Sequence, residues 1–224
     1  MTQPALLIVH GAWHRPEHFD PLVEQLSGFD VHRVALTSSG IDPGKLGDMY
    51  TDAAVIAAAA AAIDGPVVVL AHSYGGIPTT QGLRYATNVR RILYLASFQL
   101  HPGQSLLSPN DGALMPWATR RDNHVRAATP LHTFYNDVDD VTARRAVARL
   151  GYQSYASMNQ QLTAAAWHVI PSTYIICEAD NAIPPARQEV FARNADAVVR
   201  MPTSHSPFLS QPAALAALVA GFLT

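Results

Sequence analysis

The chain of 224 residues has little charge, almost no lysine and a single cysteine. Charged residues make up 14% of the sequence, whereas roughly 25% is typical of globular domains. Lysine occurs only at Lys45 and the arginines are scattered, so no basic block predicts binding to nucleic acid or to an anionic membrane surface. A surface so poor in charge is compatible with self-association, so a homodimer stays open.

The single cysteine, Cys177, excludes a disulfide framework and a cysteine-based metal site within one chain. It lies in an apolar run, where we expect a buried and unreactive strand position. The longest apolar stretch, residues 53–63, is too short to cross a bilayer. The first residues show neither the basic segment nor the small-residue cleavage site of a secretory signal. We therefore expect a cytoplasmic protein that does not associate with membranes.

Hydrophobic residues, by contrast, are abundant at 49% of the chain, and the length suits one domain over residues 1–224. Short β-rich apolar runs alternate with amphipathic stretches of helical spacing. This alternation predicts an α/β fold with a mostly parallel sheet of about six strands and helices on both faces. We expect strands at residues 5–9, 31–36, 67–71, 91–96, 173–177 and 197–201. We expect helices at residues 19–26, 77–85, 185–194 and 212–222, with an alanine-rich helix capped by Thr51.

The segment at about residues 98–168 interrupts this alternation. It is rich in proline, asparagine and aspartate at first and then carries two helical patterns, near residues 141–150 and 154–165. An insertion of this size between two strands predicts a small helical cap over the carboxyl edge of the sheet. Ligands bind at that edge in open α/β sheets.

Residues 67–78 read V-V-V-L-A-H-S-Y-G-G-I-P, a strand, a tight turn and the start of a helix. This is the context in which the G-x-S-x-G pattern marks a nucleophilic serine, here Ser73. The positions two before and two after the serine must be small because the turn presses them against neighbouring backbone. Gly75 fits this rule. Ala71 replaces the usual first glycine and adds one methyl group at that position.

Attack on an ester carbonyl builds negative charge on oxygen, which two fixed backbone N–H groups can stabilise. One donor in this arrangement is the residue after the nucleophile, Tyr74. The second is expected from the loop H-G-A-W-H at residues 10–14, where Gly11 permits close approach and Ala12 presents its N–H.

His10, His14 and His18 recur at four-residue spacing, which is compatible with a metal-binding helix face. Gly11 and Pro16 interrupt any such helix and no acidic ligand accompanies the histidines, so we expect no metal site.

The general base should be a histidine late in the chain, because the order in this arrangement is serine, acid, histidine. His205 follows the last predicted strand in a loop, as that role requires. The acid should lie after the strand at residues 173–177, where Asp180 is the leading candidate and Glu178 its rival. The predicted catalytic triad is therefore Ser73, His205 and Asp180.

These pieces together resemble the plant methylesterase and hydroxynitrile lyase branch of the α/β-hydrolases and its short bacterial relatives. The motifs are H-G-A-W-H at 10–14, A-H-S-Y-G-G at 71–76, I-P-S-T-Y-I-I-C-E-A-D-N-A-I-P-P at 170–185 and S-H-S-P-F-L-S-Q-P at 204–212. The resemblance implies a cofactor-free enzyme with a small helical cap that acts on small esters. The lyases of that branch carry a threonine at the position of Gly11 and a lysine at that of Ser206, so the lyase reading is disfavoured on charge grounds.

We accordingly expect a serine hydrolase that cleaves small carboxylic esters, of methyl or aryl type, through an acyl-enzyme. Its partner would be a small-molecule ester. Three alternatives stay open: a non-hydrolytic lyase or decarboxylase with the same triad, a cofactor-free dioxygenase, and a ligand-binding protein on the same fold. Candidate residues for an apolar substrate pocket are Trp13, Phe98, Met115, Trp117, Phe134 and Trp167.

Overall fold

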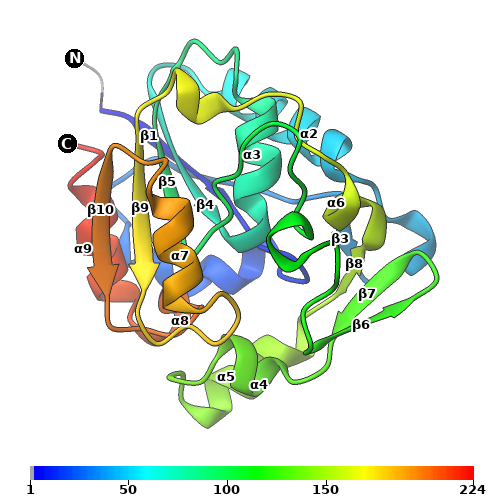
Figure 1. The fold of residues 1–224 in the computed structure, drawn as a ribbon. Coiled ribbons are helices and arrows are strands. Elements are labelled where there is room, and N and C mark those ends of the chain that lie inside the picture. Colours follow the sequence, from blue (N-terminus) through cyan, green and yellow to red (C-terminus); the bar gives the residue numbers. More distant parts are fainter. Residues whose placement is uncertain (1–2) are drawn as a thin grey trace.

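The computed structural model describes residues 3–224, and its centre is a six-stranded sheet. The strand order is β10-β9-β5-β4-β1-β2, and every neighbouring pair is parallel (Figure 1). The predicted parallel sheet of about six strands is therefore confirmed. The strands are β1 (Ala5–Val9), β2 (Val31–Val34), β4 (Val67–His72), β5 (Val89–Leu95), β9 (Ser172–Cys177) and β10 (Ala197–Met201).

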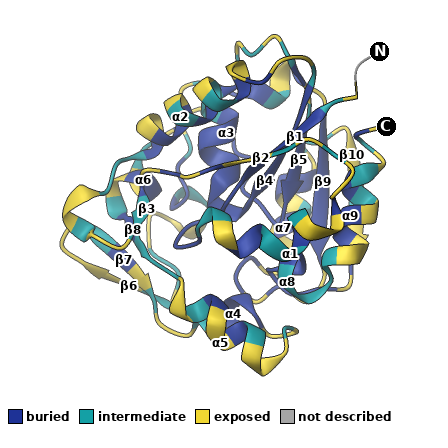
Figure 2. Cartoon of the chain, turned by 180° about the vertical axis from the view of Figure 1, so that it is seen from behind, coloured by how far each residue is buried: buried dark blue, intermediate teal, exposed yellow. Residues whose placement is uncertain are grey.

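Both faces of this sheet are covered, which explains why its inner strands read as unbroken apolar runs. Side chains alternate along β1, so that Leu6 and Ile8 enter one core while Leu7 and Val9 enter the other. Figure 2 shows the central strands as buried along their length. One core is closed by α1 (Asp20–Gln25), α8 (Pro207–Ser210) and α9 (Pro212–Ala220), the other by α2 (Met49–Ala61), α3 (Gly76–Gly82) and α7 (Pro185–Ala192).

The N-cap of helix α2 lies three residues before the predicted cap, Thr51. Asp48 is the N-cap, and its carboxylate accepts a hydrogen bond from the N–H of Thr51. The Thr51 hydroxyl in turn accepts from the N–H of Asp48, which completes a capping box. Thr51 therefore contributes to the cap from inside the first turn rather than as the N-cap itself. At 13 residues α2 is far shorter than a bilayer span, and no helix within residues 3–224 is long and apolar enough to cross a membrane.

The insertion between β5 and β9 contains strands as well as the predicted helices. In Figure 1 the arrowheads of β9 and β10 point toward α4 and α5, so these helices of the insertion lie at the carboxyl edge of the sheet. A second, antiparallel sheet has the order β3-β8-β7-β6. The insertion comprises β6 (Ala118–Arg121), β7 (His124–Ala127), α4 (Pro130–Phe134), α5 (Asp140–Ala148), β8 (Tyr152–Ser154) and α6 (Tyr155–Asn159), while β3 (Ser39–Gly40) comes from the segment after β2.

The predicted helix at 154–165 is shorter in the structure, where α6 ends at Asn159. Gln160, the residue that follows the helix, adopts an extended conformation. Its amide oxygen accepts from the N–H of Met49 and its amide nitrogen donates to Asp48, so it ties the insertion to the start of α2. Short 3-10 helices complete the chain: η1 (Pro16–Phe19), η2 (Pro43–Lys45), η3 (Ser73–Gly75), η4 (Ser108–Asn110) and η5 (Ala166–His168).

Candidate active site

Ser73 stands on a strained turn between β4 and α3. Its φ is +53°, in the left-handed region that non-glycine residues rarely occupy. The backbone there is held by the Ser73 carbonyl, which accepts from the Ser97 hydroxyl at 2.7 Å and from the N–H of Phe98 at 3.4 Å. Strain of this kind persists only where neighbours enforce it, and it is typical of functional sites.

The small residues around Ser73 have a direct steric reason. A Cβ atom added at Gly75 would lie 2.5 Å from the carbonyl oxygen of His10. A Cβ atom added at Gly11 would lie 2.8 Å from the Cβ of Ser73. The loop at residues 10–14 therefore packs directly against the turn that carries Ser73, as the sequence predicts for an oxyanion hole.

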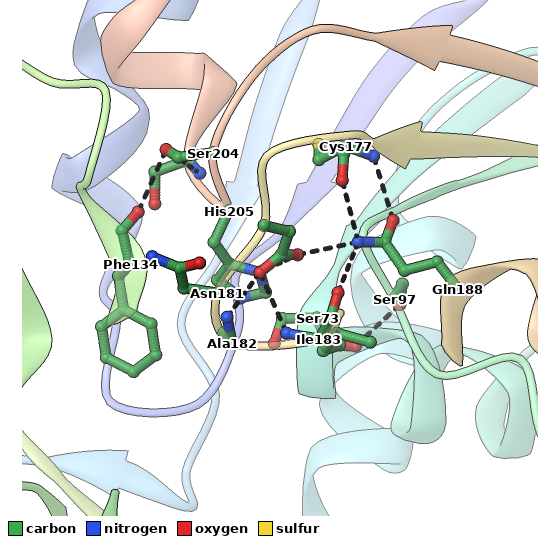
Figure 3. A network of polar contacts seen from close by, with 12 residues as sticks. Ser73, Ser97, Phe134, Cys177, Asn181, Ala182, Ile183, Gln188, Ser204 and His205 are labelled. Carbon is green, nitrogen blue, oxygen red and sulfur yellow. Dashed lines mark hydrogen bonds and ion pairs between the residues drawn. The ribbon is translucent and has the colours of Figure 1, made fainter. Parts of the chain in front are cut away.

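His205 and Asp180 form a buried pair beside this turn. The Nδ1–H of His205 donates to Oδ2 of Asp180 at 2.7 Å, and both side chains are almost fully inaccessible to solvent (Figure 3). A carboxylate can only accept, so it fixes the proton on Nδ1 and leaves Nε2 free as a proton acceptor. Glu178 is exposed and pairs instead with Arg200 at 3.8 Å. Between the two carboxylates, only Asp180 contacts the histidine.

Three further hydrogen bonds hold the Asp180 carboxylate in place. The N–H groups of Ala182 and Ile183 donate to Oδ1 at 2.7 and 2.9 Å. The amide of Gln188, which is fully buried on α7, donates to Oδ2 at 2.9 Å, the same oxygen that accepts from His205. Sequence reasoning missed Gln188. The only sign of it in the sequence is a polar residue on the buried face of a helix.

Ser73 and His205 line one small cavity together with the two residues expected to form the oxyanion hole, Ala12 and Tyr74. Neither backbone N–H of this pair donates to another protein group within residues 3–224. The volume open to the centre of a water-sized sphere is about 20 Å³. That volume has room for roughly one water molecule. Its other walls are apolar: Trp13, Phe98, Leu106, Met115, Trp117, Phe134, Ala182 and Ile183.

Five of the six apolar residues expected in the pocket are thus present, and Trp167 is not among the lining residues. Its indole N–H donates to the carbonyl of Leu100, and its ring packs edge-on against His101 and His168. Sequence reasoning missed Leu106, Ala182 and Ile183, which carry no chemical signature that distinguishes them from core residues.

A larger hollow of about 470 Å³ lies beside the small cavity. The two share walls, so the shared side chains form a partition between the inner cavity and the surface. The remaining walls of the hollow include Asn110, Asn181 and Arg187. The shared residues are Phe98, Leu106, Met115, Trp117, Ala182 and Ile183.

The histidines of the N-terminal region are engaged in hydrogen bonds. Within the described chain, no group of three or more histidine, cysteine or acidic residues is placed to hold a metal ion. His14 uses its Nδ1–H to bind the carbonyl of Ala12 at 2.9 Å, and its Nε2 accepts from the Tyr135 hydroxyl at 3.0 Å. Burial lowers the pKa of His14 far below its ordinary value and that of His10 to about 4. These side chains are neutral and hold the loop at residues 10–14 by hydrogen bonds.

His72 precedes the nucleophile, and its ring packs against the ring of His205 with the centroids 4.6 Å apart. Its Nε2–H donates to the backbone carbonyl of His205 at 3.0 Å, and its ring packs against Phe19 and Phe208. Burial lowers the pKa of His72 well below its ordinary value. His72 therefore supports the backbone of His205 and does not compete with it as a base.

Comparison with known proteins adds a sequence match over nearly the whole chain. The sequence model of the Alpha/beta hydrolase family matches residues 6–218. The protein named Alpha/beta hydrolase nvfD from Aspergillus novofumigatus is 28% identical, over 95% of this chain and 93% of that one. The protein named Probable hydrolase R7 from a Phoma species is 30% identical, over 98% of each chain.

Solved structures with the same fold include proteins named as a pyrethroid hydrolase and as a methylesterase. A pyrethroid hydrolase from Sphingobium faniae superposes with a TM-score of 0.85 at 23% identity, covering 98% of this chain and 97% of that one. A methylesterase from Arabidopsis superposes with a TM-score of 0.82 at 21% identity, covering 98% of each chain. At these identities the superpositions establish a shared fold.

Proposed function

The chain belongs to the α/β-hydrolase family, and from this premise we propose that it hydrolyses small carboxylic esters through Ser73, His205 and Asp180. One observation carries the proposal: a serine on a strained turn and a histidine bound to a buried carboxylate line the same small apolar cavity. Each of the two groups has other uses in proteins. Their convergence on one cavity is the arrangement that acyl transfer requires.

In the proposed reaction, Ser73 Oγ attacks the ester carbonyl while Nε2 of His205 takes the serine proton. The same nitrogen then gives that proton to the departing alcohol, and an acyl-enzyme remains on Ser73. Water attacks the acyl-enzyme with His205 as base, which releases the acid and restores the serine. Asp180 keeps the imidazole in the tautomer that this sequence of transfers needs and stabilises its cationic form.

The tetrahedral intermediates carry a negative oxygen, for which the N–H groups of Ala12 and Tyr74 are the proposed donors. Both residues line the cavity, and neither N–H is engaged elsewhere in the described chain. Donors that are already oriented stabilise the developing charge without reorganisation, and each is worth about 3 kcal/mol of activation free energy.

The proposed substrates are esters with a compact, uncharged acyl group, of methyl-ester or aryl-ester type. The inner cavity is apolar apart from the reacting groups and holds little more than one small group. The larger hollow outside the partition can accept the remainder of the ester. The names of the pyrethroid hydrolase and the methylesterase that share this fold support ester chemistry in such a framework.

The lyase alternative is less compatible with this site. A lyase-type threonine at position 11 would place its Cβ within 2.8 Å of the Cβ of Ser73, so the loop or the turn would have to move. Position 206 is a buried serine, which offers no cation for a cyanide leaving group. The two positions together favour hydrolysis.

The test is Ser73→Ala assayed with p-nitrophenyl acetate, followed by a screen of aliphatic and aromatic methyl esters. We expect the variant to lose activity by a factor on the order of 10⁴ or more, because no second nucleophile lines the described cavity. Ser172→Ala, at a buried serine on β9 outside the cavity, is the matched control and should retain wild-type turnover. Wild-type activity in Ser73→Ala would refute the assignment.

Two further assays on the purified protein distinguish hydrolysis from the alternative functions. Labelling of Ser73 by a fluorophosphonate requires an activated hydroxyl and would exclude a ligand-binding protein with an inert site. Release of equal amounts of alcohol and acid identifies a hydrolase, whereas a lyase gives a carbonyl product and a dioxygenase consumes oxygen.

A further inference from the structure

We propose that Tyr74, Asp52 and Gln153 form a buried clamp that positions both N–H donors of the oxyanion hole. The inference rests on the proposed function and assigns a role to three side chains that do not touch the reacting atoms. They are positioning residues, and they join two segments that the reaction needs in a fixed relation: the turn after β4 and the loop after β1.

The first end of the clamp is the side chain of Tyr74, the residue whose backbone N–H is one of the proposed donors. Its hydroxyl donates to Oδ2 of Asp52 at 2.7 Å, and both residues are completely buried. The phenol therefore anchors the residue at the opposite end from its backbone. A rotation that displaced the N–H would have to break this hydrogen bond or move α2, which carries Asp52.

The second end is the backbone N–H of Trp13, the residue after the other donor, Ala12. It donates to Oε1 of Gln153 at 3.2 Å, and Trp13 lies at a φ of +63°, a conformation that its neighbours must enforce. The Trp13 carbonyl also accepts from the N–H of Gly151 at 2.8 Å. The strand β8 and the residues before it thus bind both sides of the Trp13 peptide.

Ser38 connects the two ends. Nε2 of Gln153 donates to the Ser38 hydroxyl at 2.8 Å, and that hydroxyl donates to Oδ2 of Asp52, the oxygen that also accepts from Tyr74. The connection from Trp13 to Tyr74 is therefore unbroken, and Gln153, Ser38 and Asp52 are all fully buried.

A purely structural role explains this network less well. Asp52 has no cationic partner among the ion pairs of the described residues, and its carboxylate depends on four donors: Tyr74, both polar groups of Ser38, and Thr37. Burial raises the pKa of Asp52, which means that the ionised carboxylate destabilises the folded state at neutral pH. A buried carboxylate without a cationic partner lowers the stability of the folded state. A misplacement of about 1 Å in a catalytic group can lower the rate 100-fold, so precise positioning of the donors is a reason to keep such a carboxylate.

The experiment compares Tyr74→Phe and Gln153→Leu, one variant for each end of the clamp. We expect each to lower kcat by about 10-fold, less than the 10² to 10³ that follows from losing a donor outright, with KM within about twofold. The affinity for a trifluoromethyl ketone, whose adduct with Ser73 carries the oxyanion, should fall by the same factor as kcat. The double variant should lose far less than the product of the single effects, because either change opens the same clamp.

Tyr94→Phe is the matched control. Its hydroxyl is equally buried and bonds the hydroxyl of Thr80 at 2.8 Å, away from the oxyanion loop. It should lower thermal stability comparably while leaving kcat and inhibitor affinity unchanged. Rates are normalised to sites titrated with fluorophosphonate, so a loss of folded protein does not mimic a loss of kcat. If Gln153→Leu does not fold, Gln153→Met takes its place.

Hydrogen exchange supplies a readout that does not depend on catalysis. We expect faster exchange in the peptide containing residues 10–14 in both clamp variants and no change in Tyr94→Phe. Unchanged kcat, inhibitor affinity and exchange in both clamp variants would overturn the inference even if Ser73→Ala is inactive. An active Ser73→Ala would instead overturn the proposed function, which keeps the two failures distinguishable.

Discussion

At the scale of single residues, the choice between Asp180 and Glu178 shows what local sequence leaves open. Both follow β9 within three positions, and both fit the chain order of the predicted triad. The difference arises in the turn, where the N–H groups of Ala182 and Ile183 point at Oδ1 of Asp180 and hold it toward His205. Glu178 faces solvent and the side chain of Arg200.

Asp180→Asn tests that assignment. An asparagine amide offers hydrogen-bond donors as well as an acceptor, so it can stabilise the tautomer in which Nε2 of His205 carries the proton and cannot act as a base. We expect kcat to fall by about 10⁴-fold with the fold retained. Glu178→Gln, measured alongside with the same ester, should stay within twofold of wild type. A large loss in Glu178→Gln with an active Asp180→Asn would reverse the assignment.

The predicted site residues that the structure brings together are those whose neighbours in the chain determine their geometry. Ser73 lies in a strand–turn–helix pattern, and the loop at residues 10–14 carries its own glycine and histidines. Gln188, Asp52 and Gln153 have no such pattern, because their partners lie 8 to 140 positions away along the chain. A buried polar side chain acquires its role from whatever the fold brings to it, and only the folded structure supplies that information.

At the scale of elements, the same distinction separates the sheet from the insertion. The six parallel strands were predictable because burial on both faces makes each one a continuous apolar run. The strands β6, β7 and β8 are short, β6 is mostly exposed, and β8 pairs with a two-residue strand more than 100 positions earlier. Such pairing leaves no local period in the sequence, so a helical cap was predicted where the structure has helices and an antiparallel sheet.

The insertion also provides four of the six residues of the partition in front of Ser73, and Trp117 is the largest of them. This ring packs edge-on against Trp13 and Phe134 and lines both the inner cavity and the outer hollow. Trp117→Leu should enlarge the inner cavity and raise kcat/KM for a bulky aromatic ester several-fold relative to p-nitrophenyl acetate.

Trp167→Leu is the control for this prediction, since Trp167 belongs to the same insertion but lies outside the cavity. The ratio of the two specificity constants should not change in that variant. Equal ratios in wild type and Trp117→Leu would show that Trp117 does not limit acyl size.

At the scale of the whole molecule, four buried histidines link folding to pH. Burial lowers the pKa values of His10, His14, His18 and His72, with His10 at about 4. All four side chains are neutral in the folded state and packed among aromatic rings or backbone carbonyls. The unfolded chain instead exposes imidazoles that titrate near pH 6.5, so below that pH it binds more protons than the folded chain does.

The sign of the effect follows from this difference. A depressed folded-state pKa contributes stability that is complete above about pH 6.5 and is lost as the pH falls toward 4. Each of the four histidines can contribute a slope of up to about 1.4 kcal/mol per pH unit in that window. Asp52, whose pKa is raised by burial, acts in the opposite sense, but it is one group against four.

We therefore expect the free energy of unfolding, measured by urea titration, to fall by several kcal/mol between pH 7 and pH 5. His18→Gln should flatten the curve, because the glutamine amide can replace the Nε2–H that donates to the carbonyl of Ala146 and does not titrate. His132→Gln is the matched control at an exposed position, where water surrounds the side chain before and after unfolding. A flat stability curve in the wild type, or equal slopes in the wild type and His18→Gln, would mean that the buried histidines do not control acid stability.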